Sequence, residues 1–197
     1  MTTAPRLVLA SKSAARRAIL SNAAVPFEVD VADIDEDALK VAGVDPRQLA
    51  IDLAVEKAKA VSLRQPGAVV LGADQTLAFK DGLVSKAKSL ELAAQRLSDM
   101  RGLTHYLHSG AALVQDGKVL WSGADSAHMK VRNFSDDFLA DYIRTEGEGL
   151  LACVGSYRLE GMGSQLFEAI EGDYFTVLGL PLWPVLEGLR QAGVLKA

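Results

Sequence analysis

Cysteine, basic residues and glycine-rich loops are scarce in this sequence, and each scarcity excludes a class of protein. The single cysteine, Cys153, excludes an internal disulfide and a multi-cysteine zinc site. The chain has 21 lysines and arginines against 25 aspartates and glutamates, so its net charge is −4 at pH 7. That balance argues against binding to a nucleic-acid polymer, which requires an excess of basic residues. The lack of a glycine-rich phosphate loop argues against a P-loop enzyme.

Long apolar runs are also missing. The run near the N-terminus, residues 7–10, is too short for the core of a signal peptide. No segment approaches the ~18–20 consecutive apolar residues that span a bilayer. We therefore predict a cytoplasmic protein with no membrane partner.

The sequence does contain enough apolar residues for a sizeable core. Of its 197 residues, 49% are hydrophobic and 23% are charged, a balance typical of a folded globular protein. No repeat, low-complexity tract, long linker or shift of composition marks a boundary. Residues 1–197 are therefore predicted to form one domain.

Local patterns predict an α/β fold with a mixed β-sheet and flanking helices. Apolar or glycine-bounded runs predict strands over 6–10, 26–31, 68–73 and 155–163, and antiparallel strands within 104–131. Helical spacing and helix-start residues predict helices over 11–22, 46–64, 89–100, 135–145 and 181–191. Asp-Gly dipeptides at 81–82 and 116–117 predict two hairpin turns.

The segment from Ser11 to Arg17 has the pattern of an anion site. Ser11-Lys12-Ser13 follows a predicted strand, and Arg16 lies in the first turns of the helix that comes next. A helix start offers unpaired N–H groups, and serine hydroxyls and an arginine add donors suited to phosphate. The alternative is an ordinary capped helix with surface arginines.

Lys57 lies on the apolar stripe of its predicted helix. Ala50, Ala54 and Ala58 share the stripe at helical spacing, whereas Lys59 lies near the opposite side, where acidic neighbours make it a solvated residue. An ammonium directed inward needs an anionic partner. The alternative is that Lys57 reaches the rim of the stripe and so contacts water.

Asp74 is predicted to end a buried strand. Residues 68–73 form an apolar run that would be covered on both faces, and Asp74-Gln75-Thr76 follows. Open α/β sheets place ligand chemistry at the carboxyl ends of strands, where a carboxylate can hold a divalent cation or orient a water. The alternative is a turn residue that bonds to its own backbone.

Several further residues are weaker candidates when each is taken alone. An acidic loop can contribute to a Mg²⁺ site or simply be solvated, and its carboxylates are Asp33, Asp35, Glu36 and Asp37. Single candidates for a site are Lys86, Arg158, Glu160 and Asp173. Aromatic rings can stack on a base but are expected in the core, as Cys153 is; they are Phe134, Tyr157, Phe167 and Tyr174. Histidines expected on strand surfaces are His105 and His108.

A series of short motifs runs through nearly the whole chain. In order they are Leu9-Ala10-Ser11-Lys12-Ser13, Arg16-Arg17, Asp35-Glu36, Glu56-Lys57-Ala58, Gly72-Ala73-Asp74-Gln75, Lys86, Glu171-Gly172-Asp173-Tyr174 and Val177-Leu178-Gly179-Leu180-Pro181-Leu182. The series resembles the Maf family of nucleoside triphosphate pyrophosphatases. Within that family, Asp74-Gln75 and residues 155–161 are similar to the branch that acts on 7-methyl-GTP.

The resemblance implies an activity, a set of site residues and a fold. The activity is hydrolysis of a nucleoside triphosphate, such as 7-methyl-GTP or another modified nucleotide, to the monophosphate and pyrophosphate. The residues implied to bind the triphosphate are Ser11, Arg16, Lys57 and Lys86. Asp74 is implied as the proton acceptor, and the residues implied near a divalent metal, Mg²⁺ or Mn²⁺, are Asp74, Glu36 and Glu160. The fold implied is an elongated α/β type, shared with inosine triphosphate pyrophosphatases, with two lobes around a cleft and commonly a homodimer.

Three positions depart from the family pattern. Ala14 and Ala87 stand where prolines are usual, and Ala15 stands where many members carry an arginine. These departures concern loop rigidity and some phosphate contacts, and leave the carboxylates in place. The sequence also leaves open a dTTP/UTP pyrophosphatase, a non-catalytic nucleotide-sensing regulator of cell division, and an α/β domain whose charged residues are all on the surface.

Overall fold

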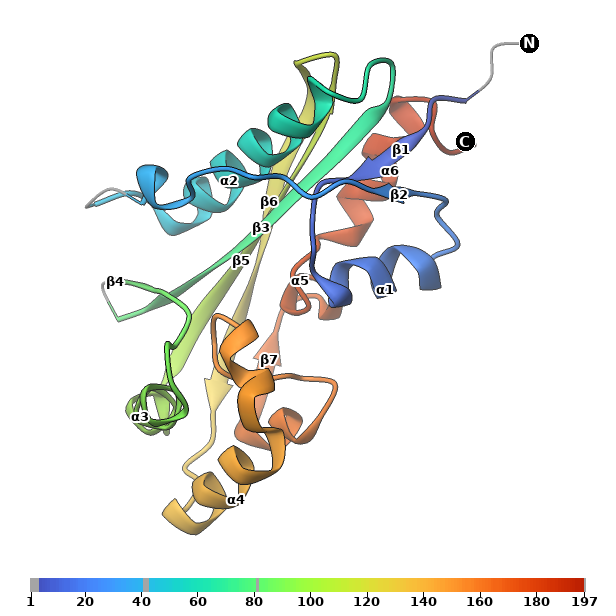
Figure 1. The fold of residues 1–197 in the computed structure, drawn as a ribbon. Helices are drawn as coiled ribbons and strands as arrows, with labels where there is room; N and C mark the ends of the chain where they lie inside the picture. The colour runs from blue at the N-terminus through green and yellow to red at the C-terminus, as the bar shows by residue number, and fades with distance from the viewer. Residues whose placement is uncertain (1–3, 41–42, 81, 197) are drawn as a thin grey trace. The chain divides into compact units, whose positions relative to one another are not determined.

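A mixed β-sheet flanked by helices forms the framework of the protein (Figure 1). The computed structural model describes residues 4–40, 43–80 and 82–196. The strands are β1 (Leu7–Leu9), β2 (Glu28–Val29), β3 (Val69–Phe79), β4 (Gly82–Val84), β5 (Thr104–Gln115), β6 (Lys118–Val131) and β7 (Phe167–Glu171). Their order is β2-β1-β3-β5-β6-β7, with β4 paired to β3. β1 is parallel to β2 and β3, whereas β3–β4 and β6–β7 are antiparallel, which confirms the predicted mixed α/β sheet.

The chain divides into two compact units. Among the described residues, the first unit comprises 4–40, 43–75, 108–125 and 173–196, and the second comprises 76–80, 82–107 and 126–172. β3, β5 and β6 contribute residues to both units. The two lobes that the family resemblance implies correspond to these units. That residues 1–197 form a single domain stays a prediction.

The first unit packs helices on both faces of its strands (Figure 1). Its helices are α1 (Ala14–Asn22), α2 (Pro46–Ser62), α5 (Tyr174–Val177) and α6 (Leu182–Gln191), with a 3-10 turn η1 (Asp37–Leu39). Side chains alternate along β1, so Leu7 and Leu9 join the core under α1 and α6, whereas Val8 joins the core under α2. Burial on both faces explains why these strands read as continuous apolar runs.

Two glycines bring α2 directly onto the sheet. A side chain added at Gly72 would collide with Ala54 and Ala58 of α2, and one added at Gly110 would collide with the backbone of Ala50. The small residues predicted as one stripe of this helix therefore meet two glycines of the strands. This close approach brings the helix face that carries the stripe against β3, and Lys57 comes from the same helix.

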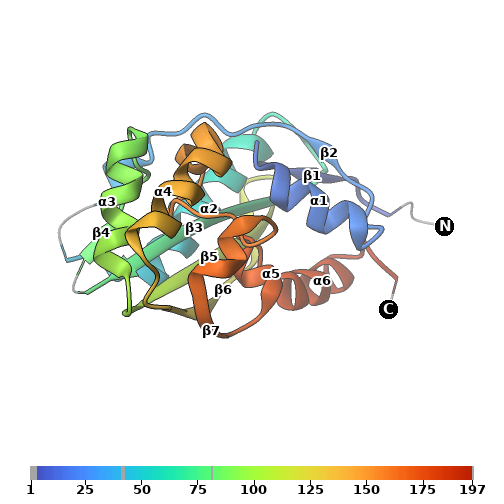
Figure 2. The same ribbon diagram turned by 90° about the horizontal axis from the view of Figure 1, so that it is seen from below.

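The second unit carries the remaining helices. They are α3 (Leu90–Met100), α4 (Asp136–Glu146) and the 3-10 helices η2 (Gly147–Ala152) and η3 (Met162–Leu166). Ser89 and Ser135 cap α3 and α4 by accepting hydrogen bonds from backbone N–H groups, as their sequences predict. α3 packs against α4 and η2 (Figure 2). No helix in the part of the chain that the structure describes is both long and apolar enough to cross a bilayer.

The predicted strand over 155–163 is wrong. This segment consists of turns followed by η3, and the strand of the region is β7, which the sequence did not indicate. Ser156 has a φ of +59°, in the left-handed region, and Gly163 packs so closely on Arg158 that it has no room for a side chain. A chain folded back on itself in this way cannot stay extended. The predicted strand over 26–31 is likewise shortened to the two residues of β2.

The two predicted hairpin turns have different outcomes. Asp116-Gly117 joins β5 to β6, and both residues have positive φ, as a two-residue hairpin turn requires. β3 and β4 form the other predicted hairpin, with Phe79 opposite Gly82, while Asp81 of its turn lies outside the described residues.

The expected surface position of His105 is wrong. His105 is fully buried, and its Nε2 shares a hydrogen bond of 2.6 Å with the hydroxyl of Tyr157. Strand alternation explains this, because His105 and Leu107 point to the covered face of β5 while Tyr106 points outward. Among the residues expected in the core, Phe134 and Tyr157 are buried, Phe167 and Cys153 are half-buried, and Tyr174 is exposed.

Candidate active site

Arg16 is one of two buried cations among the phosphate-binding candidates, with Lys57, and the start of α1 positions it. Ser13 caps the helix by accepting a hydrogen bond of 3.3 Å from the backbone N–H of Arg16. The guanidinium then donates from Nη1 to the Oγ of Ser11 at 3.2 Å and from Nε to the carbonyl of Gly179 at 2.8 Å. Two bonds from different segments fix the guanidinium plane, while Arg17 is exposed. Of the two arginines, the structure therefore selects Arg16 for the candidate site.

Gly179 is a partner of Arg16 that the sequence motif contained without revealing its role. It has a φ of +99°, a conformation that favours glycine, and an added Cβ would lie 3.5 Å from Nε and Nη2 of Arg16. The backbone conformation therefore favours glycine here, while an added Cβ would make only an ordinary van der Waals contact with the guanidinium. No chemical signal at Gly179 itself pointed to Arg16, which lies 163 residues earlier in the chain.

Lys57 bridges two carboxylates from different segments. Its Nζ lies 2.8 Å from Oε1 of Glu36 and donates to Oδ1 of Asp74 at 3.0 Å. The side chains of Lys57 and Asp74 are only 11% and 15% exposed, and that of Glu36 is 44% exposed. The predicted inward direction of Lys57 is confirmed, and so is the solvated position of Lys59, which pairs with Glu56 at 3.0 Å.

The acidic loop contributes one of its carboxylates to this bridge. Glu36 reaches Lys57, whereas Oδ1 of Asp35 accepts a hydrogen bond from the backbone N–H of Ala38 at 3.3 Å. Asp33 is exposed, and the side chain of Asp37 lies outside what the structure describes.

Asp74 lies within a strand and does not end one. β3 continues past Asp74 to Phe79 because its distal part pairs with β4, where Leu77 faces Val84. The strand that ends here is the parallel neighbour β1, whose last residue, Leu9, faces Leu71. Ser11 therefore follows the carboxyl end of β1 beside the point where β3 runs on to Asp74. Asp74 therefore does lie beside the carboxyl end of a strand, as predicted, but that strand is β1 and not its own.

Electrostatics links the two halves of the cluster formed by Ser11, Arg16, Glu36, Lys57 and Asp74. Burial lowers the pKa of the Arg16 guanidinium, and the negative charges of Asp74 and Glu36 oppose that shift. Arginine stays protonated in proteins, so the cluster holds two cations and two carboxylates in a largely buried place. Such a cluster can bind an anion through its cations and accept a proton through a carboxylate.

A family model supports the assignment that the motifs suggested. The model described as "Maf: Maf-like protein" matches residues 6–192. The chain belongs to the Maf family.

Curated relatives cover nearly the full length of this Maf chain. A nucleoside triphosphate pyrophosphatase of Caulobacter vibrioides is 50% identical, with 96% of each chain covered. A second nucleoside triphosphate pyrophosphatase, from Maricaulis maris, is 47% identical over 97% of this chain and 98% of its own. A 7-methyl-GTP pyrophosphatase of Rhizobium etli is 45% identical over 97% of this chain and 98% of its own.

Solved structures show a partial likeness. A HAM1 protein from Coxiella burnetii has a TM-score of 0.42 and 15% identity, covering 66% of this chain and 74% of that one. A dITP/XTP pyrophosphatase from Mycobacterium abscessus has a TM-score of 0.40 and 14% identity, covering 75% of this chain and 96% of that one. That the protein shares its fold with inosine triphosphate pyrophosphatases stays a prediction.

The departures from the Maf pattern leave the start of α1 well formed. The helix begins at Ala14 with Ser13 as its cap, so the missing proline does not displace the first turn. Ala15, at the position where many members have arginine, is half-buried, and Ala87 is buried in the second unit.

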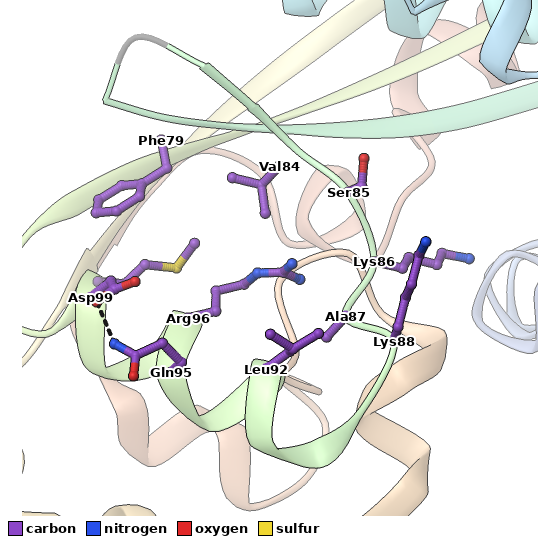
Figure 3. Close-up of a pocket in the computed structure, with 11 residues that line it drawn as sticks. Phe79, Val84, Ser85, Lys86, Ala87, Lys88, Leu92, Gln95, Arg96 and Asp99 are labelled. Atoms are coloured by element: carbon purple, nitrogen blue, oxygen red, sulfur yellow. Dashed lines mark hydrogen bonds between the residues drawn. The ribbon is translucent and has the colours of Figure 1, made fainter.

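Lys86 and Glu160, the other two predicted site residues, belong to the second unit. Lys86 lines a cavity of about 410 Å³ between β4 and α3, where it and Lys88 project from the connecting loop (Figure 3). Lys86 and Glu160 are both exposed. They act on the same neighbour, because burial and then Glu160 raise the pKa of the Cys153 thiol, while Arg158 and Lys86 lower it. The charges of Lys86 and Glu160 thus act on the Cys153 thiol in opposite directions.

Gln75 has a structural role that sequence reasoning missed. Its Nε2 lies 3.0 Å from each of three acceptors, the Oγ of Ser109 and the carbonyls of Thr176 and Val177 in α5. The residue after Asp74 therefore ties β3 to α5, a short helix that ends just before Gly179. Its position beside Asp74 in a family motif was the one signal in the sequence.

The donor set of the first unit fits a hard divalent cation. Glu36 and Asp74 offer carboxylate oxygens, and Mg²⁺ commonly takes one or two carboxylates together with substrate phosphates. Within the described residues, no group of three or more histidine, cysteine, aspartate or glutamate side chains is gathered for a metal. The residues present therefore suit a cation that shares its ligands with a substrate.

Proposed function

We propose that this Maf protein hydrolyses the α–β phosphoanhydride of a nucleoside triphosphate, releasing pyrophosphate and leaving the monophosphate. The observation that carries the proposal is the convergence of Arg16, Lys57, Glu36 and Asp74 from four separate segments. The names of the full-length relatives support the reaction class. We propose 7-methyl-GTP as a substrate, because several relatives at about this identity carry that name.

Cationic and hydroxyl groups bind the triphosphate in this proposal. Arg16 is held in place by Gly179 and Ser11, so its fixed fork can grip phosphate oxygens without losing further rotamer freedom. Lys57 adds a mobile charge on a flexible stem. Lys86 of the second unit is a further proposed phosphate ligand. These charges stabilise the negative charge that develops on the departing pyrophosphate.

Asp74 acts as the general base. Lys57 contacts Oδ1, so we assign Oδ2 to the attacking water. The water oxygen forms a bond to the α-phosphorus, its proton passes to Asp74, and the bond from that phosphorus to the bridging oxygen breaks. The bridging oxygen leaves with pyrophosphate. The position of Asp74 within a paired strand holds the carboxylate rigidly for this step.

A divalent cation, Mg²⁺ or Mn²⁺, is part of the proposal. Asp74 and Glu36 would hold it, with Glu160 as the third residue that the family resemblance implies. When bound, such an ion offsets negative charge on phosphate oxygens.

Replacing Asp74 tests the proposal. Asp74→Asn keeps the shape and leaves Lys57 paired with Glu36, but removes the proton acceptor. We expect pyrophosphate release from 7-methyl-GTP to fall by more than ~100-fold, the scale of general-base catalysis. The matched control is Asp52→Asn on α2, where the carboxylate accepts from Gln48, and it should keep normal turnover.

A substrate panel decides the base preference. Pyrophosphate release is measured for 7-methyl-GTP, dTTP, UTP and the four common ribonucleotides. Preference for dTTP and UTP would replace the substrate proposal and keep the reaction. Tight nucleotide binding without turnover in Mg²⁺ or Mn²⁺ would instead mark a nucleotide sensor. A homodimer and a cytoplasmic location rest on family resemblance and on the sequence, and stay proposals.

A further inference from the structure

The bridge made by Lys57 has a consequence for the cation of the proposed reaction. One ammonium contacts a carboxylate oxygen of Glu36 at 2.8 Å and one of Asp74 at 3.0 Å. These are the carboxylates of the first unit that would hold the divalent ion. In the structure, a positive side chain therefore occupies the place between them.

An ammonium and a divalent cation cannot share this place. Like charges a few ångströms apart repel strongly, and the repulsion is greater where side chains are as little exposed as those of Lys57 and Asp74. A metal bound to the same two oxygens, Oε1 of Glu36 and Oδ1 of Asp74, must therefore displace Lys57. Separating the ammonium from its anions and leaving it unpaired in a poorly exposed place is costly. The displaced lysine therefore requires another anion.

We propose that Lys57 holds the place of the divalent cation until a nucleotide arrives. Phosphate oxygens then draw the ammonium away from Glu36 and Asp74, and the carboxylates become available to the metal. The inference rests on the proposed function and adds an order to it, in which the free enzyme disfavours metal and nucleotide binding enables metal binding.

Lys57 suits this exchange better than Arg16 does. Arg16 is held by Ser11 and the carbonyl of Gly179, and its planar fork has a fixed orientation. Lys57 has a flexible stem that can swing its charge over several ångströms, and the groups that it contacts are the two carboxylates themselves. The exchange leaves neither carboxylate without a cation, because one divalent ion replaces the one ammonium that both of them contact.

Metal binding without nucleotide tests this proposal directly. Free Mn²⁺ is titrated by electron paramagnetic resonance against the wild type and Lys57→Met, which keeps the length of the side chain and removes its charge. We expect Lys57→Met to bind Mn²⁺ about tenfold or more tightly than the wild type, because a cation close to the metal is gone. Lys59→Met on the same helix, two residues away and paired with Glu56, should match the wild type. Equal affinity in all three proteins would overturn the proposal.

A second measurement uses the wild type alone and decides the matter if Lys57→Met does not fold. Lysines are acetylated with an activated ester, with and without Mn²⁺ at concentrations up to tens of millimolar, and each site is quantified by mass spectrometry. Displacement predicts that Mn²⁺ raises labelling of Lys57 while Lys59 stays unchanged. Bound Mn²⁺ with Lys57 still protected would refute the competition.

The two proposals can fail separately. Wild-type hydrolysis of 7-methyl-GTP is assayed in the same preparation. If the wild type hydrolyses none of the nucleotides in the panel, the result counts against the proposed function, whatever the Mn²⁺ titrations give. Normal hydrolysis by the wild type, together with a Mn²⁺ affinity of Lys57→Met equal to that of the wild type, would count against the ordered exchange alone.

Discussion

At the scale of single residues, the buried guanidinium of Arg16 has a geometry that lysine cannot reproduce. Its Nε and Nη1 donate in two directions, to Gly179 and Ser11, whereas a lysine has one nitrogen at the end of a flexible stem. We expect Arg16→Lys to lower the free energy of unfolding by about 1–3 kcal/mol, because at least one of the two acceptors loses its partner. Urea unfolding measures this loss.

Arg17→Lys is the matched control for that substitution. Arg17 is the next residue of α1 and is exposed, so the change should stay within about 0.5 kcal/mol. Equal stability of Arg16→Lys and Arg17→Lys would contradict the anchoring that we describe. The same pair, assayed for nucleotide affinity, separates a fixed phosphate ligand from general positive charge.

At the scale of elements, Gln75 holds α5 against β3. Its amide donates toward two carbonyls of α5 and the hydroxyl of Ser109, all at 3.0 Å. Gln75→Glu replaces the donor with a carboxylate oxygen that faces those carbonyls. We expect it to lower the free energy of unfolding by about 2 kcal/mol or more, since the Val177 carbonyl would lose this donor and both carbonyls would meet a negative charge, while Ser109 still donates to the Thr176 carbonyl. Gln75→Ala should cost less, because it removes the donor without adding charge.

The control for the added charge is Gln165→Glu, at an exposed position of η3. It should leave stability nearly unchanged in the same urea experiment. If Gln75→Glu proved as stable as Gln165→Glu, the tie between β3 and α5 would contribute nothing measurable. The tie matters for the site because α5 is followed by Gly179, the anchor of Arg16.

Elements with local signals could be predicted from the sequence, and those set by distant contacts could not. Helices α3 and α4 begin after capping serines, and the turn at Asp116-Gly117 carries its own dihedral preference, so each is determined by adjacent residues. The end of β3 depends on pairing with β4, which no local pattern at Asp74 records. The segment 155–163 has the spacing of a strand but folds into turns because Gly163 packs against Arg158.

The candidate site follows the same division. Helical spacing alone placed Lys57 inward, and the strand–serine–helix order pointed to Arg16. The partners of these residues come from elsewhere in the chain: Glu36 from one of several acidic positions in a loop, and Gly179 from the last motif. Spacing along one element cannot identify a partner that tertiary folding supplies.

At the scale of the whole molecule, net charge and local charge serve different purposes. The chain carries −4 overall, yet its most buried charged side chains include Arg16 and Lys57. A small polyanion responds to the local cations, whereas a long nucleic acid responds to the wider surface. The overall acidity therefore remains compatible with a triphosphate substrate.

The stability of the whole molecule should depend on pH through His105. Burial lowers the pKa of His105 from 6.5 to about 4, and its Nδ1 has no hydrogen-bond partner among the described residues. The unfolded chain therefore takes up a proton below about pH 6.5 while the folded protein does not. Stability is complete above that pH, decreases as the pH falls toward 4, and levels off below it. A shift of this size corresponds to a loss of about 3 kcal/mol, since each pKa unit is worth about 1.4 kcal/mol.

His105→Gln isolates this contribution, because glutamine can still bond to the hydroxyl of Tyr157 but does not titrate. Free energies of unfolding of both proteins are measured in urea from pH 7.5 to 4.5, a range in which other groups titrate equally in the two. The advantage of the wild type over the variant should shrink steadily as the pH falls below 6.5. A difference that stays constant across this range would mean that His105 has the same pKa in the folded and unfolded states, and that its burial carries no cost on protonation.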